Sequence, residues 1–519
     1  MKQRCQYKTI LQLHFVSGMI IYFRTLSFHQ NLGRDKMQIS RRKPLTGKVA
    51  VLSVGLDTYW KQFPGLLDEL KEKTASLISK LGSHHVEVTD LGMIDNAGKA
   101  YAVLPALKAA DPDVLFVDMV TYATSATFAA VIREINCPVV LVALQPLKAM
   151  NYTRGTTYMQ LCNDDFCSVP EFTGVAERMG RKVADVIIGS LEDDPVADEE
   201  LAVWCRIACV RHDLRRARFG LMGHVLDTML DMQTDPTAVT AAFGAHVYPC
   251  EPDEIMTEYA ALSDGDTEVQ VMSGRILDFF DTPEPGADAV AQKLTQKDLL
   301  TAARAAVALE KFILRRNLDG FAYYYESCPD SAMRELVTNF IVGNSLLTSA
   351  GFPMCGEFDI KTCIAMLIMD RLEIGGSFAE FHPIDFVRGT VLVGHDGPHH
   401  LNIAGQKPVI RSLKKYHGKP GTGAGVEFSI QSGPITLLSI GVKADGKFKF
   451  IIAEGEAFDY PIPATGNTNT HGKFQPDIRT FLKKWSLEGP THHFALGIGH
   501  HARTIQKIAE SFNIEAVIV

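Results

Sequence analysis

Short apolar runs alternate with helix-like stretches in the first part of the chain, and this alternation restricts the possible folds. Residues 48–54, 113–117 and 138–144 are nearly continuous apolar runs, as expected of parallel strands buried on both faces. Residues 85–89 alternate between apolar and polar side chains, whereas residues 64–81 carry apolar side chains at helical spacing. The repetition of strand, helix and strand predicts a doubly wound α/β domain.

A second α/β unit is predicted further along the chain. Residues 217–222, 245–248 and 320–325 are typical of short strands, and residues 296–317 of a long helix. Neither half of the chain carries a GxGxxG or GxxxxGK[ST] phosphate loop. This absence argues against the use of a dinucleotide or of ATP.

The last third of the sequence consists mainly of β-rich runs that are separated by Gly and Pro. The runs are residues 390–393, 409–413, 426–431, 435–442 and 448–453. Asp445-Gly446 between the last two runs is a strong hairpin signal. Adjacent strands of this kind predict a mainly antiparallel sheet or small β-barrel, followed by a helix at 504–512 and a strand at 515–519.

These changes in pattern divide the chain into four parts. We expect a disordered extension over residues 1–44, an N-terminal α/β domain over 45–204, a central α/β domain over 205–375 and a C-terminal barrel over 376–519. The first 36 residues superficially resemble a signal peptide, but their apolar run is interrupted by polar residues and no cleavage site follows. We interpret them as an unstructured or over-annotated extension.

Composition excludes several classes of protein. The 519 residues include 52 Lys and Arg against 60 Asp and Glu, a net charge of −8, so a nucleic-acid partner is not expected. A hydrophobic content of 46% is that of a globular chain. The ten cysteines are scattered and form no CxxC pair, which favours reduced thiols and a cytoplasmic location. We expect no membrane partner, because no run of 18 uninterrupted apolar residues occurs.

Chargeable side chains gather in the C-terminal part of the sequence, where ten of the 17 histidines lie within the last 140 residues. Glu357 and Glu380 each stand where a predicted regular element breaks, and His395 ends a predicted strand. Such positions favour convergence on a pocket. The alternative for a single glutamate is a solvated loop carboxylate.

A second signal is the pair His500-His501, which lies between a predicted strand and a predicted helix. Ligands of α/β proteins usually bind at such turns. The alternative for this pair is helix capping or core packing. A third cluster, His399-His400, has the alternative of a hydrated loop.

Together these residues predict a mixed site of two glutamates and two histidines. Carboxylate oxygens with imidazoles suit Mn²⁺ first, with Mg²⁺ or Co²⁺ as alternatives. Such a metal stabilises an enediolate as a Lewis acid, while a flanking carboxylate moves a proton between two carbons. The chemistry predicted from these residues is an aldose–ketose isomerisation.

The motifs GEFDIKT, SFAEF, VGH and GIGHHART, in this order, resemble those of the L-arabinose isomerase and L-fucose isomerase superfamily. The resemblance implies that Glu357 and Glu380 are both catalytic and metal-binding residues, and that His395 is a third metal ligand. In the final pair it favours His501 as the fourth ligand, which leaves His500 as a substrate-binding candidate.

The resemblance also implies an architecture of two Rossmann-like α/β domains and a C-terminal β-barrel, assembled as a homotrimer or homohexamer with sites between subunits. By this analogy Tyr59 reaches a neighbour's site, and Gln145 matches a glutamine of the family. Ala143 stands where the arabinose branch has a substrate-facing histidine, so the resemblance leaves the sugar open.

We therefore expect a metal-dependent isomerase that acts on a free pentose or deoxyhexose. Two alternatives remain at this point. One is a non-catalytic sugar-binding protein, in which the four site residues would lie apart. The other is a metal-dependent epimerase or hydrolase that acts on a sugar derivative.

Overall fold

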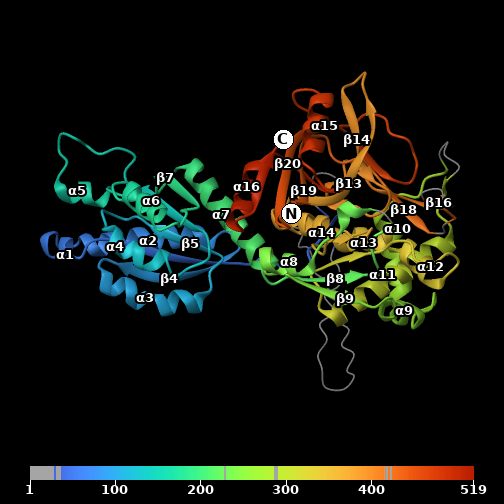
Figure 1. Cartoon of the computed structure of the whole chain (residues 1–519), viewed down its shortest axis with the longest axis horizontal. Helices are drawn as coiled ribbons and strands as arrows, with labels where there is room; N and C mark the ends of the chain where they lie inside the picture. The colour runs from blue at the N-terminus through green and yellow to red at the C-terminus, as the bar shows by residue number, and fades with distance from the viewer. Residues whose placement is uncertain are drawn as a thin grey trace, which may run out of the picture.

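The computed structural model of the protein consists of two lobes, which helix α7 (Pro195–Leu214) joins (Figure 1). The structure describes residues 28–30, 37–226, 229–285, 290–413, 415–416, 419–420 and 423–519. Most of the expected N-terminal extension, residues 1–27 and 31–36, lies outside these ranges. Among the described residues, no helix is both long and apolar enough to cross a membrane.

The N-terminal lobe contains a five-stranded parallel sheet in the order β4-β3-β5-β6-β7. Its strands are β3 (Gly47–Val54), β4 (Val86–Ile94), β5 (Val114–Asp118), β6 (Val139–Gln145) and β7 (Asp185–Ser190). Its helices are α1 (Thr58–Gln62), α2 (Leu66–Gly82), α3 (Ala97–Ala110), α4 (Ser125–Ile132), α5 (Thr157–Cys162) and α6 (Val169–Arg178). The three apolar runs of the sequence are the buried central strands, which confirms the predicted doubly wound α/β fold.

The central α/β part contains a four-stranded parallel sheet in the order β12-β11-β8-β9. Its strands are β8 (Arg218–Met222), β9 (His246–Cys250), β11 (Gly320–Tyr323) and β12 (Met354–Cys355). Its helices are α8 (Pro236–Phe243), α9 (Pro252–Ala260), α10 (Thr267–Phe279), α11 (Gln296–Arg316), α12 (Ala332–Thr338), α13 (Phe340–Ser349) and α14 (Ile360–Arg371). A 3₁₀ turn, η1 (Leu230–Met232), follows β8.

The C-terminal part is a closed antiparallel barrel of six strands, as predicted. Around the barrel the order is β19-β22-β13-β14-β21-β20, and β20 pairs with β19 to close it. These strands are β13 (Gly375–Asp385), β14 (Thr390–His395), β19 (Gly433–Val442), β20 (Phe448–Phe458), β21 (Thr468–Phe474) and β22 (Phe494–Ile498). The other elements are α15 (Ile478–Leu487), α16 (Ala502–Ser511) and β23 (Glu515–Ile518), which pairs with β20 in parallel.

Two β-rich runs of the C-terminal third lie outside the barrel. Strand β15 (Val409–Leu413) pairs with both β10 (Ala291–Gln292) and β18 (Ala424–Glu427) in a separate three-stranded sheet. The predicted hairpin at Asp445-Gly446 does connect two barrel strands, with Val442 opposite Phe448. Gly446 takes the positive φ of 79° that such a turn needs.

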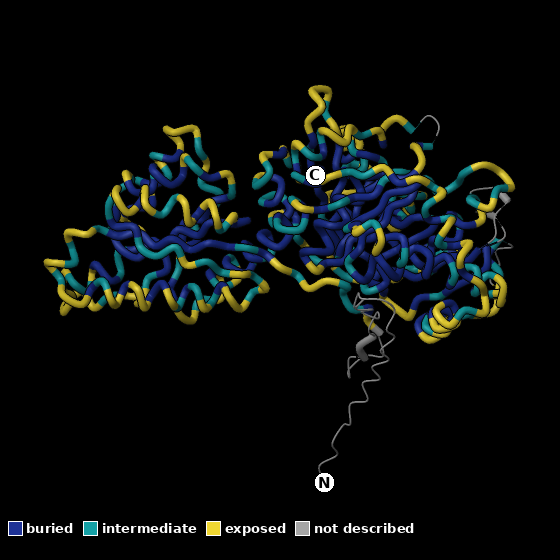
Figure 2. Tube along the Cα trace, turned by 90° about the horizontal axis from the view of Figure 1, so that it is seen from below, coloured by how far each residue is buried: buried dark blue, intermediate teal, exposed yellow. Residues whose placement is uncertain are grey.

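Helix α14 is the element around which the second lobe is built. All twelve of its residues are buried, including the charged Lys361, Asp370 and Arg371. It packs between strand β11 of the central sheet and barrel strands β13, β19 and β22. In Figure 2 the buried residues fill the middle of both lobes. One buried cluster contains Val51, Trp204, Ile364 and Ile505, so the interior is continuous across α7.

The last residues of the expected extension contact the folded parts. The Ile39 N–H donates to Asn402 Oδ1 at 2.9 Å, Arg41 pairs with Asp370 at 2.5 Å, and Lys43 pairs with Asp319 at 2.7 Å. Residues 39–43 are therefore held against the second lobe. The expected domain boundaries themselves remain predictions.

Candidate functional site

Glu357 stands in a strained turn between strand β12 and helix α14. Glu357 and Phe358 both have positive φ, 59° and 63°, which residues with a Cβ rarely adopt. The helix cap at Asp359 stabilises the end of this turn, since its Oδ1 accepts from Thr362 N at 3.1 Å and its Oδ2 accepts from Thr362 Oγ1 at 2.7 Å. Strain of this kind is often found where a side chain must be aimed at a site.

Glu380 and His395 face the same turn from two neighbouring barrel strands. Glu380 of β13 lies opposite Gly394 of β14, so His395 is one residue further along β14. His395 Nε2 is 3.8 Å from Glu357 Oε1 and 3.8 Å from Glu380 Oε1. The structure therefore brings together three of the four predicted metal ligands.

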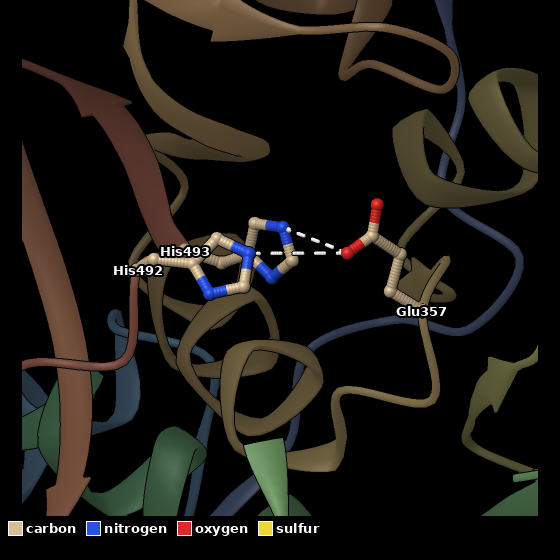
Figure 3. Close-up of side chains that lie close together, drawn as sticks. All are labelled: Glu357, His492 and His493. Carbon is tan, nitrogen blue, oxygen red and sulfur yellow. Dashed lines mark ion pairs between the residues drawn. The ribbon is translucent and has the colours of Figure 1, made fainter. Parts of the chain in front are cut away.

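Two further histidines, which sequence reasoning did not select, complete the cluster. His493 directly precedes strand β22, which pairs with β13. His493 Nε2 is 3.4 Å from Glu357 Oε2, and the ring is fully buried. His492 Nε2 is 3.9 Å from the same oxygen, but this ring is 36% exposed. Figure 3 shows both rings pointing toward the Glu357 carboxylate.

An aspartate holds the other nitrogen of each of these two rings. His493 Nδ1 is 3.1 Å from Asp359 Oδ2, and His492 Nδ1 is 2.6 Å from Asp231 Oδ2. A histidine whose Nδ1–H is donated to a carboxylate presents its Nε2 in a fixed direction. In this way both Nε2 atoms are directed toward Glu357.

The charges of these aspartates follow from their contacts. Burial by itself would raise the pKa of Asp359, but the hydrogen bond to His493 and the Lys361 charge hold that pKa well below its usual range. The hydrogen bond from His492 lowers the pKa of Asp231 to about 2. Burial opposes the charged form of His492, yet Asp231 and Glu357 raise its pKa to about 10. Both aspartates are therefore ionised at neutral pH.

The donor atoms of the cluster suit a divalent cation. They form two overlapping groups, one of Glu357, His492 and His493 and one of Glu380, His395 and His493. Within each group the ligand atoms lie within 4.8 Å of one another. Glu357 Oε2 and His493 Nε2 are buried and have no hydrogen-bond partner among the described residues. A cation between them would satisfy both atoms.

His501, the expected fourth ligand, lies away from this cluster, whereas His493 lies within it. Strand β22 separates the two residues, because His493 precedes it and His501 follows it by three positions. A five-residue strand alone spans about 17 Å, so the two rings cannot share one coordination shell. His501 N instead donates to Thr436 Oγ1 at 3.0 Å and the residue caps helix α16.

The three expected substrate-binding residues also lie outside the cluster within one chain. His500 Nε2 is 3.2 Å from the Gly455 carbonyl oxygen and 3.6 Å from Glu456 Oε1. Tyr59 belongs to α1, which lies at the end of the N-terminal lobe far from the barrel (Figure 1). Gln145 ends strand β6 of the same lobe, where its Nε2 donates to the Leu147 carbonyl oxygen at 2.5 Å.

Some of the missed residues had a local signal in the sequence. His492-His493 stands at the start of the strand predicted over residues 491–496, a position comparable with that of His395 at a strand end. Asp359 stands two residues after Glu357 inside the motif GEFDIKT. Asp231 had no such signal, because it is 261 positions away from His492.

Comparison with known proteins agrees with this picture. Residues 375–515 match the domain family described as the L-arabinose isomerase C-terminal domain. The chain is 24% identical over 363 residues to the L-arabinose isomerase of Klebsiella pneumoniae (strain 342), covering 67% of this chain and 69% of that protein. It is 25% identical over 355 residues to the L-arabinose isomerase of Herpetosiphon aurantiacus, covering 66% and 68% of the two chains. The matched domain family and these relatives together support the resemblance of the chain to the L-arabinose isomerase and L-fucose isomerase superfamily.

Proposed function

We propose that this protein is a metal-dependent aldose–ketose isomerase that acts on a free pentose or deoxyhexose. The observation that carries the proposal is the convergence of Glu357, Glu380, His395 and His493 from the end of β12 and from three barrel strands. The similarity to proteins named L-arabinose isomerase supports the reaction class. An enzyme of this class is an intramolecular oxidoreductase.

The same four residues are the proposed holders of the metal. Two carboxylates and two imidazoles favour Mn²⁺, with Mg²⁺ or Co²⁺ as alternatives. When bound, such an ion supplies Lewis acidity at adjacent hydroxyl and carbonyl oxygens of the sugar. Asp359 orients one of these ligands, because it accepts the Nδ1–H of His493 and fixes the direction of that ring.

Glu357 and Glu380 are the proposed catalytic residues. Both lie beside His395, each with one carboxylate oxygen 3.8 Å from its Nε2. In an enediol-type isomerisation, a carboxylate removes the proton from the carbon next to the carbonyl and then returns it to the former carbonyl carbon, while the hydroxyl proton moves to the former carbonyl oxygen. Glu380 is better placed to reach a sugar, since its side chain is 25% exposed against 9% for Glu357.

We further propose that the active protein is a homotrimer or homohexamer, in which the N-terminal lobe of one copy closes the site of its neighbour. Tyr59 and Gln145 are the candidate residues of this closing surface. Two exposed aromatic side chains, Tyr152 in the loop between β6 and α5 and Phe166 in the loop between α5 and α6, support a contact role for this part of the lobe. A cytoplasmic location agrees with the nine described cysteines, all of which are free thiols.

The test is to incubate the purified chain with Mn²⁺ and a panel of aldopentoses and 6-deoxyhexoses, and to measure ketose by a colour reaction. We expect one or a few sugars to give ketose, and Glu380→Gln to abolish the reaction. Glu456→Gln, a substitution of a half-exposed glutamate elsewhere in the barrel, serves as the matched control and keeps full activity.

Three results would count against the proposal. Absence of ketose from every sugar would overturn the isomerase function. Formation of an epimer or of a hydrolysis product would favour the metal-dependent alternatives. Sugar binding that is independent of added metal, without turnover, would favour a binding protein.

A further inference from the structure

Asp231 joins the segment after β8 to the barrel at the edge of the candidate site. Its Oδ2 accepts two hydrogen bonds from His492, one from the backbone N–H at 3.0 Å and one from Nδ1–H at 2.6 Å. One carboxylate oxygen therefore fixes both the backbone and the ring of the same residue. The contact is long-range, because the two residues come from the central part and from the barrel.

The segment that carries Asp231 is anchored from its other side by a buried lysine. Lys361 is fully buried in α14, and its Nζ donates to the Asp231 carbonyl oxygen and to Thr234 Oγ1, both at 3.0 Å. Burying an ammonium group is costly unless its hydrogen bonds are satisfied. Residues 231–234 are thus held at two points, and the Asp231 carboxylate has little freedom to move away from His492.

The two neighbouring histidines are supported alike but exposed differently. Each donates its Nδ1–H to an aspartate and directs its Nε2 toward Glu357 Oε2. His493 is fully buried, whereas 36% of the His492 side chain is open to solvent. His492 Nε2 is therefore the one that an incoming sugar can reach, beside the carboxylate that we propose as a metal ligand and catalytic residue.

We propose that Asp231 is a positioning residue that holds His492 in place to bind a hydroxyl group of the sugar. This inference rests on the proposed function, since it concerns the substrate of the same site. The Asp231 carboxylate contacts His492 and, among the described residues, forms no hydrogen bond or ion pair with the proposed metal ligands, so its removal should spare the metal. What it supplies is the fixed direction of one ring beside the reacting sugar.

The test compares Asp231→Ala and Asp231→Asn with the wild type in three measurements on the full chain. These are Mn²⁺ affinity, binding of a pentitol panel (ribitol, xylitol and L-arabinitol) to the Mn²⁺-loaded protein, and kcat and KM on the sugar that is turned over. Asp445→Asn, at an exposed hairpin turn where the carboxylate accepts from Lys447 N, is the control.

We expect Asp231→Ala to bind Mn²⁺ like the wild type but to lose about tenfold in pentitol affinity, the factor expected for one hydrogen bond to a charged group. KM should rise, and kcat should fall less than it does in Glu380→Gln. Asp231→Asn should recover part of the loss, because its Oδ1 can still accept the Nδ1–H of His492. A purely structural role would lower the melting temperature without this partial recovery of substrate binding.

Each contrary result has a distinct meaning. Unchanged pentitol affinity in Asp231→Ala overturns the inference, and so does a parallel loss of Mn²⁺ affinity. Absence of any pentitol binding to the Mn²⁺-loaded wild type also overturns it. If the wild type binds pentitols but turns over no sugar, the proposed isomerase function fails, and the pentitol affinities of the two variants still decide the role of Asp231.

Discussion

Nδ1 of His493 lies 3.1 Å from Oδ2 of Asp359, and neither side chain is exposed to solvent. The contact joins the turn at the start of α14 to the start of strand β22. Because the Asp359 carboxylate is ionised, it accepts the Nδ1–H and leaves His493 Nε2 free to face Glu357. One aspartate therefore caps the central helix and also orients a histidine of the site.

Replacement of Asp359 should weaken metal binding although Asp359 is not itself a proposed ligand. In Asp359→Asn the carboxylate charge is lost, and the amide can present a donor group to His493. Loss of such an outer-shell partner typically costs about 10- to 100-fold in metal affinity. Calorimetric titration with Mn²⁺ would measure the change, with Asp231→Asn as the variant that keeps wild-type affinity. Equal Mn²⁺ affinity in Asp359→Asn and the wild type would contradict this view of the contact.

Two single substitutions separate His493 from His501. We expect His493→Ala to lose most of its Mn²⁺ binding, because it removes the one residue that both metal-binding groups share. His501→Ala should bind Mn²⁺ like the wild type, since His501 lies beyond the other end of β22. The measurement is the Mn²⁺ bound per chain after dialysis. Loss of metal in His501→Ala with retention in His493→Ala would restore the ligand expected from the sequence.

The sequence predicts a site in this part of the fold and favours His501, which lies at the opposite end of strand β22 from His493. Glu357 and His395 could be identified because each stands at the end of a regular element, whereas Glu380, expected at such a break, lies within strand β13. Two His-His pairs flank strand β22, and both satisfy the same local criterion. The pairing of β22 with β13 decides between them, since it places Phe494 opposite Ala379, next to Glu380. This register is a long-range contact that a local pattern does not contain.

The fold shows the same division between local and long-range information. The continuous apolar runs of β3, β5 and β6 predicted buried parallel strands, and these form the centre of the first sheet. The runs that became β15 and β18 were also strands, but they pair with each other outside the barrel, and the third strand of their sheet, β10, precedes β15 by more than a hundred residues. Strand propensity predicts that such segments are extended, whereas tertiary packing decides which sheet they join.

A buried aspartate of the N-terminal lobe should make stability depend on pH. Asp118 ends strand β5 and is fully buried, and burial raises its pKa from 3.8 to about 6 despite the nearby Lys73 and a hydrogen bond from Thr74. The folded chain therefore holds this proton more tightly than the unfolded chain does. The resulting contribution to stability is present at low pH and is lost as the pH rises from about 4 to about 6, on the order of 3 kcal/mol in all.

Asp118→Asn should remove this pH dependence, because an amide does not ionise and can still accept from Thr74. We expect the variant to be more stable than the wild type above pH 6 and to show a flatter dependence between pH 4 and pH 6. Asp165, which pairs with Lys73, has a pKa raised to about 7 by burial, so its own contribution to the pH dependence of stability remains in the variant. Thermal unfolding of the full chain across pH 4 to 8 measures the difference. If the stability of Asp118→Asn fell with rising pH as steeply as that of the wild type, Asp118 would be ionised in the folded protein.

Removal of divalent metal should destabilise the second lobe. Buried Glu357 Oε2 and His493 Nε2 have no hydrogen-bond partner among the described residues, so a bound cation would supply the partner that both lack. A ligand that binds only the folded state adds about 2.7 kcal/mol of stability at a concentration 100 times its Kd. We expect Mn²⁺ to raise the melting temperature of chelator-treated protein, and His493→Ala to show no such rise. His501→Ala is the matched control and should respond like the wild type. A melting temperature that is insensitive to Mn²⁺ in an enzyme that isomerises sugars would place the metal outside this cluster.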